Sequence, residues 1–162
     1  MNYWILQSNP ECFDILNWLR DFNWLHDESL VDCWNISWFA KEVEPEDIVF
    51  IWKSKAKSDI RGIYAKGKLG PLPEKFPLED REVHYFIGEE GKAKKRRLDS
   101  LPLIAVRYTK LYLDKPLLSD TIEKVPELRG LTILAKGHVH RRGIHRLQIE
   151  QGRIIESILS IA

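Results

Sequence analysis

The stretch DIVFIWKSKAKSDIRGIYA, residues 47–65, carries the strongest strand signals of this 162-residue chain. Ile48–Lys53 is a run of β-branched and aromatic residues, which are the residue types that strands favour. A polar connection follows at Lys55–Asp59, and Ile60–Lys68 resumes as a strand whose glycines fit bulges. The pattern predicts two strands separated by a lysine-rich connection.

The segment before this stretch predicts a strand, a helix and a further strand. Asn2–Gln7 alternates as strands do, and the proline that follows favours a helix start. The helix is expected over Glu11–Asp21, where apolar residues recur at helical spacing. Asp32–Phe39 holds three apolar residues at a spacing of two, which on a strand share one face. These are Trp34, Ile36 and Trp38.

The segment after the stretch adds strands and a second long helix. Val83–Ile87 and Leu101–Leu113 predict strands, and we expect an irregular excursion at Gly88–Lys95 between them. Leu147–Leu159 places its apolar residues on one helical face and predicts a closing helix. With roughly five to seven strands and no βαβ regularity, the chain is predicted to be an α+β domain with a small, twisted sheet or barrel.

The composition fits one intracellular domain. A chain of 162 residues is long enough to bury a core, and 44% hydrophobic with 30% charged residues is ordinary for a globular protein. The longest apolar stretches are too short to span a bilayer, and two cysteines are too few for a disulfide framework. We therefore expect a single cytoplasmic domain over residues 1–162 with no membrane partner.

Charge and tryptophan both divide the chain near residue 52. All six tryptophans precede Lys53, and residues 1–52 hold ten acidic residues against two basic ones. That balance of −8 leaves +9 for the other 110 residues, given the net charge of +1. Basic clusters lie within 53–68, 92–97 and 136–153. They predict a polyanion-binding face if the fold gathers them; the alternative is a set of solvated loops that balance the acidic third.

No catalytic motif stands out. The chain has no phosphate loop, dinucleotide glycine fingerprint, zinc-protease signature or serine elbow. His138 and His140 would point the same way on a strand and could hold a metal, but the arginines around them oppose a divalent ion. We expect no enzymatic activity, no cofactor and no metal, and interpret this loop as a basic surface, either exposed or in contact with phosphate.

The tryptophans carry the functional hypothesis. A base taken out of its stack is read by stacking and by hydrogen bonds to its edges, and stacking contributes roughly 1–3 kcal/mol per base. Trp34, Trp38 and Trp52 lie on neighbouring predicted strands, so they could converge. The alternative is that tryptophans build the hydrophobic core, which we expect for Trp4 and Trp18.

Several segments, taken in order, resemble one family. They are Tyr3-Trp4-Ile5-Leu6, Asp32–Ser37, Asp47–Ser54, Arg61–Ala65 and the Pro102–Leu118 region before the closing helix. Together they resemble an EVE domain over nearly the whole chain. The resemblance implies a PUA-like mixed β-barrel with flanking helices, similar in fold to YTH domains. It also implies a pocket for a modified nucleobase, often a modified cytosine in DNA, and restriction-type or RNA-modification partner proteins.

The resemblance further implies roles for single residues. Trp34 and Trp52 would enclose a base, and Ser54 and Asn9 would bond its edge. The family often has a basic or polar segment after Ile36, so Trp38 departs from its pattern and would form a third wall if it faces the pocket. The cations expected to hold the flanking phosphates are Lys53, Lys55, Lys57, Arg61, Arg141 and Arg142. The leading hypothesis is thus a non-catalytic reader of a modified base in nucleic acid. The alternatives are an RNA- or tRNA-binding PUA-like module without modification preference, and an enzyme acting on a planar substrate.

Overall fold

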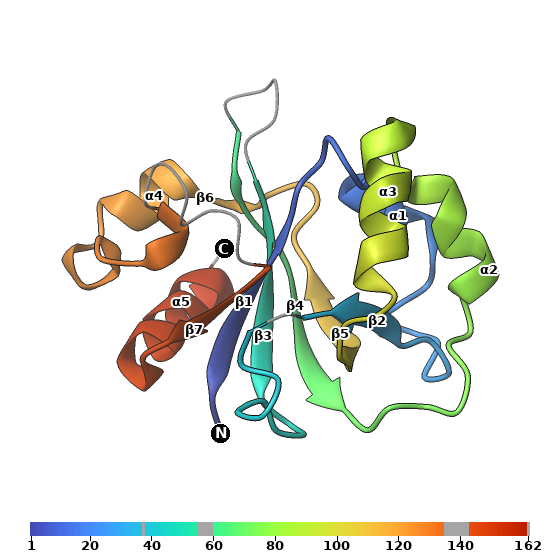
Figure 1. Ribbon diagram of the computed structural model, residues 1–162. Helices are drawn as coiled ribbons and strands as arrows, with labels where there is room; N and C mark the ends of the chain where they lie inside the picture. The colour runs from blue at the N-terminus through green and yellow to red at the C-terminus, as the bar shows by residue number, and fades with distance from the viewer. Residues whose placement is uncertain (37, 55–59, 135–142, 162) are drawn as a thin grey trace.

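A mixed seven-stranded sheet forms the centre of the computed structural model, which describes residues 1–36, 38–54, 60–134 and 143–161. The strand order is β2-β5-β4-β3-β1-β7, with β6 paired to β4; β1 runs parallel to β3 and the other pairs are antiparallel. The strands are β1 Tyr3–Ser8, β2 Asp32–Asn35, β3 Ile48–Lys53, β4 Gly62–Gly70, β5 Leu103–Leu111, β6 Leu117–Leu118 and β7 Ile144–Leu147. The sheet curls into a half-barrel (Figure 1), which confirms the expected α+β class with a mixed, barrel-like sheet.

Helices cover the sheet in two groups (Figure 1). Beside β2 and β5 lie α1 (Ile15–Asp21), α2 (Glu79–Glu82) and α3 (Gly88–Leu98). On the other side lie α5 (Ile149–Ile161), beside β1 and β7, and α4 (Ser119–Glu123), next to β6. Among the described residues there are also three 3-10 turns, η1 Val83–Tyr85, η2 Pro126–Leu128 and η3 Thr132–Leu134. None of the helices in these described ranges has the length and apolar character needed to cross a membrane.

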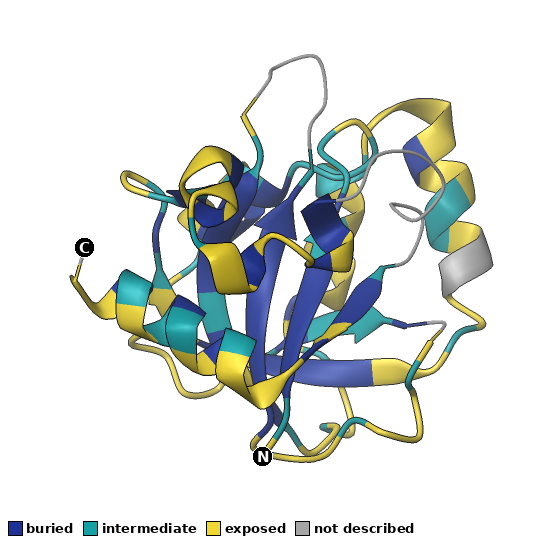
Figure 2. Ribbon diagram, turned by 90° about the vertical axis from the view of Figure 1, so that its left-hand side faces the viewer, coloured by how far each residue is buried: buried dark blue, intermediate teal, exposed yellow. Residues whose placement is uncertain are grey.

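The two helical groups enclose two separate hydrophobic cores. Successive side chains of a strand point to opposite faces, and both faces of β1 and β3 are buried, as the dark central strands in Figure 2 show. Trp4 and Ile51 belong to the core packed against α1, which we call the α1-side core. Tyr3 and Trp52 belong to the core packed against α5, which we call the α5-side core.

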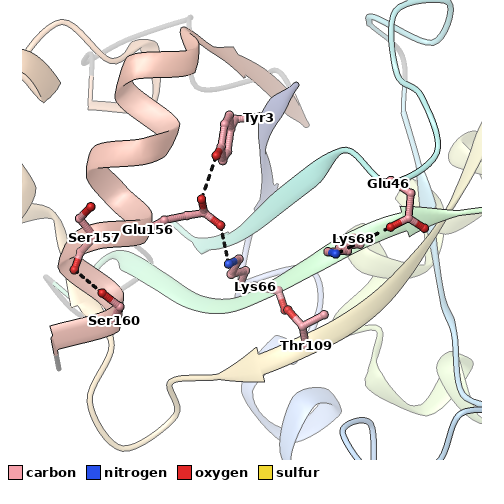
Figure 3. Close-up of polar contacts among 8 residues, drawn as sticks. All are labelled: Tyr3, Glu46, Lys66, Lys68, Thr109, Glu156, Ser157 and Ser160. Carbon is pink, nitrogen blue, oxygen red and sulfur yellow. Dashed lines mark hydrogen bonds and ion pairs between the residues drawn. The ribbon is translucent and has the colours of Figure 1, made fainter. Parts of the chain in front are cut away.

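A glycine allows α5 to lie directly on β1. Gly152 is buried near the start of α5, and a Cβ at this position would overlap the ring of Tyr3. The Tyr3 hydroxyl continues to the next turn of the helix and donates to Glu156 Oε2 at 2.8 Å. Glu156 also pairs with Lys66 of β4 at 2.5 Å, so one carboxylate links helix and sheet (Figure 3).

Two expected elements near the N-terminus have different bounds. The first helix begins at Ile15 rather than Glu11, because the Asn9 carbonyl accepts the backbone N–H groups of Cys12 and Phe13 in a turn. The Asp14 side chain then caps the helix by accepting from the Asn17 N–H. The tryptophan strand is also shorter than expected: β2 ends at Asn35, so Trp38 does not share a strand face with Trp34.

Two expected elements in the middle of the chain are wrong. The strand at Val83–Ile87 is a 3-10 turn, and the excursion at Gly88–Lys95 belongs to the three-turn helix α3. Both are held by contacts with residues far away in sequence. The Cys12 carbonyl accepts the Ile87 N–H at 2.9 Å, and Gly91 of α3 is buried so close to the same carbonyl that a Cβ would meet it at 2.5 Å.

Candidate nucleic-acid interface

Trp34 lies in the centre of β2 and is tied to the interior by its indole nitrogen. Its Nε1–H donates to Asp32 Oδ2 at 3.0 Å and reaches the Tyr108 hydroxyl at 3.2 Å. The ring packs against the α1-side core but is only half-buried. An indole with its polar edge anchored and part of its surface exposed can stack on a flat partner without losing its own hydrogen bond.

Asp32 is the centre of this polar network. Its carboxylate is buried, with the residue 4% exposed, and accepts four hydrogen bonds. Oδ2 accepts from the indoles of Trp18 and Trp34 and from the Tyr108 hydroxyl, and Oδ1 accepts from the Cys33 N–H at 2.8 Å. The network therefore joins β2 to α1 and β5.

Burial changes the protonation of the groups around β2. Loss of solvent raises the pKa of Asp32 to about 6, although the hydrogen bonds that it accepts oppose the shift. Burial and the neighbouring Asp32 charge raise the pKa of Glu82, on α2, to about 7. Burial also raises the pKa of the Cys33 thiol to about 12. Perturbed groups of this kind gather at functional sites and also in structural networks.

Several aromatic residues of the N-terminal third form a packed cluster around Trp18. Trp18 contacts Phe22, Trp24 and Tyr85 edge to face, with ring centroids 5.0 to 5.4 Å apart. Trp24 in turn meets Tyr108 edge to face at 5.0 Å and donates its indole N–H to the Trp18 carbonyl. Trp18 and Trp24 are buried, so they support the site as part of the core.

The structure does not bring the three predicted pocket tryptophans together. Trp52 is 1% exposed and belongs to the α5-side core, on the face of β3 away from the α1-side core to which Trp34 packs. Trp38 lies beyond the end of β2 and is 51% exposed. This differs from the expected convergence because β3 buries both of its faces, and its tryptophan faces α5.

The predicted edge-bonding residues lie at the ends of the parallel strands β1 and β3. The Ser54 hydroxyl accepts from Gln7 Nε2 at 2.7 Å, and Gln7 Oε1 bonds Nε2 of the buried His145 at 3.0 Å. Asn9 accepts the Glu11 N–H through its side chain at 3.0 Å and closes a turn. Gln7 points to the α5 side of β1, so Ser54 and Trp34 contact different layers of the fold.

Two of the predicted phosphate-binding cations are described, and both are engaged within the fold. Lys53 is 6% exposed, and its Nζ donates to the Ile60 carbonyl at 2.8 Å beside the ring of Tyr64. Burial lowers the pKa of Lys53. Arg61 pairs with Glu123 of α4 at 3.3 Å. The other four, Lys55, Lys57, Arg141 and Arg142, lie outside the described residues, as do His138 and His140.

Further lysines of the same basic segment are balanced by acids. Lys66 pairs with Glu156, and Lys68, two residues further along β4, has its Nζ 3.8 Å from Glu46 Oε2 (Figure 3). The second pair is exposed and contributes little. Within the part of the chain that the structure describes, no group of three or more His, Cys, Asp or Glu residues is arranged to hold a metal ion.

The sequence interpretation missed the residues that anchor Trp34. Asp32 lies two residues before Trp34 in a segment predicted to be a strand, and acidic residues are rare in strands, so its presence there was a signal. Its partner Tyr108 lies 76 residues away and is brought to it by the β2–β5 pairing, which places Asp32 opposite Val106. Glu82 had no local signal, because its burial depends on how α2 packs.

Comparison with known protein families identifies the family of this chain. The EVE domain family model matches residues 2–158. The chain belongs to the EVE domain family. A search of curated protein sequences gives no match to this EVE domain.

Solved structures share the fold of this EVE domain at low sequence identity. A hypothetical protein from Leishmania major aligns with a TM-score of 0.60 and 15% identity, over 98% of this chain and 94% of that chain. A protein from Rhodopseudomonas palustris, solved by NMR, aligns with a TM-score of 0.62 and 11% identity, over 99% and 94%. Human THYN1 protein, in complex with DNA containing 5-methylcytosine, aligns with a TM-score of 0.59 and 14% identity, over 98% and 97%. At these identities the likeness shows the fold alone.

Proposed function

We propose that this EVE domain is a non-catalytic nucleic-acid-binding protein that reads a modified base, with Trp34 as the surface on which the base stacks. The observation that carries the proposal is the state of Trp34, an indole anchored at its polar edge and only partly buried against the α1-side core. The THYN1 structure with 5-methylcytosine DNA supports a modified cytosine in DNA as the first ligand to test.

The remaining parts of the site are proposed around this tryptophan. Trp38 is the second stacking residue, because it is half-exposed and only four residues from Trp34. Asn9 and Ser54 remain the polar residues assigned to the base edge, but this assignment requires a ligand that reaches the ends of β1 and β3, because Ser54 and the buried Trp52 lie on the α5 side whereas Trp34 packs against the α1-side core. The phosphates are assigned to the cations Lys53, Lys55, Lys57, Arg61, Arg141 and Arg142, of which Lys53 and Arg61 must first leave their present partners.

Equilibrium titration tests the proposal. The protein is titrated into labelled duplexes that are identical except for one 5-methylcytosine, and into single-stranded RNA, at several salt concentrations. We expect tighter binding to the modified duplex, and affinity that falls linearly on a logarithmic scale as salt rises, because counterions are released. Equal affinity for both duplexes with tighter binding to RNA would instead identify an RNA-binding module without modification preference.

Variants of Trp34 separate stacking from phosphate contact. Trp34→Ala removes the ring, and the loss of about 1–3 kcal/mol of stacking should lower the affinity for the modified duplex by roughly 5- to 150-fold and reduce its preference over the plain duplex. Trp34→Phe keeps a ring and should retain part of the preference. Leu72→Ala, which truncates an exposed apolar side chain after β4, is the matched control and should bind as wild type does. An unchanged preference in Trp34→Ala would refute the stacking role.

A further inference from the structure

Asp32 is a buried anion whose contacts in the described structure come from neutral donors. Its four hydrogen bonds come from two indoles, one phenol and one backbone amide. A carboxylate that loses water without a cation partner is costly, and apolar residues of similar volume often replace buried ionic groups with no loss of stability. A role other than stability therefore accounts better for an acid at this position.

The geometry of the donors indicates what that role is. Trp18 and Tyr108 are buried, so packing alone restricts their rings. Trp34 packs against the core but is only half-buried, so its hydrogen bond to Asp32 restricts rotation that packing leaves open. Holding a side chain in its bound orientation before the ligand arrives saves the free energy of ordering it, which corresponds to roughly a 2- to 10-fold gain in affinity.

We infer that Asp32 is a positioning residue that holds the Trp34 indole in the orientation in which it stacks on a base. This inference rests on the proposed function, because it assigns the orientation of the stacking surface to a residue that does not touch the base. Asp32 acts through Trp34 and sets the preference for the modified base without contributing to phosphate contact.

Protonation of Asp32 provides a test in the wild-type protein. The surrounding groups supply four donors, so a neutral carboxyl, which carries a proton of its own, must displace one of them. The titratable groups facing this site are Tyr108 from β5, Cys33 from β2, and Glu82 from α2, with Lys95 of α3 acting on Glu82 and Cys33. The pKa of Asp32 near 6 places the change between pH 5 and pH 7.5.

A matched pair of variants separates this role from general damage to the core. Asp32→Asn removes the charge and turns an amide N–H toward donors. Asp47→Asn is the control, because Asp47 is 1% exposed and also accepts an indole N–H, that of Trp4 at 2.9 Å, in another part of the fold. Each variant is titrated with the modified and plain duplexes, and the Trp34 indole N–H resonance is followed by NMR from pH 5 to pH 7.5.

We expect Asp32→Asn to reduce the modification preference by roughly 2- to 10-fold, with plain-duplex affinity unchanged, and Asp47→Asn to leave the preference as it is. In wild type the preference should fall toward pH 5, the Trp34 resonance should titrate with it, and the Trp4 resonance should not follow. If Asp32→Asn does not fold, these wild-type measurements decide the question.

Two failures are distinguishable. A wild-type protein without modification preference refutes the proposed function, while a Trp34 resonance that still titrates near pH 6 supports the positioning by Asp32. A wild-type preference that is constant from pH 5 to pH 7.5, with a Trp34 resonance that does not move, overturns the inference and leaves the proposed function standing.

Discussion

Replacing Trp52 should unfold the protein more readily, whereas replacing Trp34 should weaken ligand binding. Trp52 is 1% exposed on the α5 face of β3 and is among the largest fully buried side chains of the described structure. Deleting a buried tryptophan typically costs about 3–5 kcal/mol, since transfer free energy is lost and a cavity remains. That is a large part of the roughly 5–15 kcal/mol by which domains of this kind are stable.

Urea unfolding followed by far-UV circular dichroism measures the effect without relying on tryptophan fluorescence. With a denaturant dependence near 2 kcal/mol per molar, a loss of about 4 kcal/mol lowers the midpoint by about 2 M urea. Trp34→Ala should cost about 1–2 kcal/mol, because its ring is half-buried and Asp32 keeps three other donors. Trp52→Phe, which refills most of the cavity, should recover much of the stability.

The opposite result would refute the reasoning from burial. A Trp52→Ala protein that unfolds within about 1 kcal/mol of wild type but no longer binds nucleic acid would show that Trp52 faces a ligand rather than a core. A Trp34→Ala protein that loses as much stability as Trp52→Ala would show that Trp34 is held mainly for packing.

Other predictions concern helix packing, protonation and thiol reactivity. Gly152→Ala should lower the thermal midpoint, because its Cβ overlaps the tyrosine ring of β1, whereas Gly130→Ala, with open space around it, should not. The pKa values of Asp32 and Glu82 are raised to about 6 and 7, so their contribution to stability is complete below about pH 4 and is lost as the pH rises through 7. The thermal midpoint should therefore fall from pH 5 to pH 8, and it should fall less in Glu82→Gln. Burial raises the pKa of the Cys33 thiol to about 12, and the thiolate is the form that reacts. In a protein whose other cysteine is changed to serine, Cys33 should therefore react with Ellman's reagent at pH 8 at least about a hundredfold more slowly in the native than in the unfolded state. A midpoint that rises with pH, or native thiol reactivity equal to that of the unfolded chain, would contradict the assigned burial.

The sequence predicted the strands whose composition is unambiguous. Ile48–Lys53 was expected as a strand and is β3 with the same bounds, since β-branched and aromatic residues fill it without interruption. The register irregularity between Lys66 and Gly67 likewise agrees with a bulge at a glycine. The helix at Gly88–Leu98 was missed because its glycines and lysines show no apolar period, and the carbonyl that Gly91 approaches belongs to residue 12.

The site could be predicted only in part, for a related reason. Alternation within one strand assigns residues to its two faces, but it does not say which faces of different strands meet when a sheet curls. β3 is buried along its whole length, so its pattern gave no polar face from which the direction of Trp52 could be read. Trp34 lies three strands away, with β4 and β5 in between, and packs against the other core.

The two buried aspartates show why Asp32, and not Asp47, is assigned to function. Both accept an indole N–H, and both are almost completely enclosed. Asp47 also accepts the backbone N–H groups of Asn2 and Glu44, so it holds two backbone segments in place near Trp4. The Trp4 ring is fully buried and is already restricted by packing. Asp32 holds a ring that the core covers only in part. Loss of the Asp47 carboxylate should therefore lower the free energy of unfolding. Loss of the Asp32 carboxylate should instead increase the mobility of the Trp34 indole.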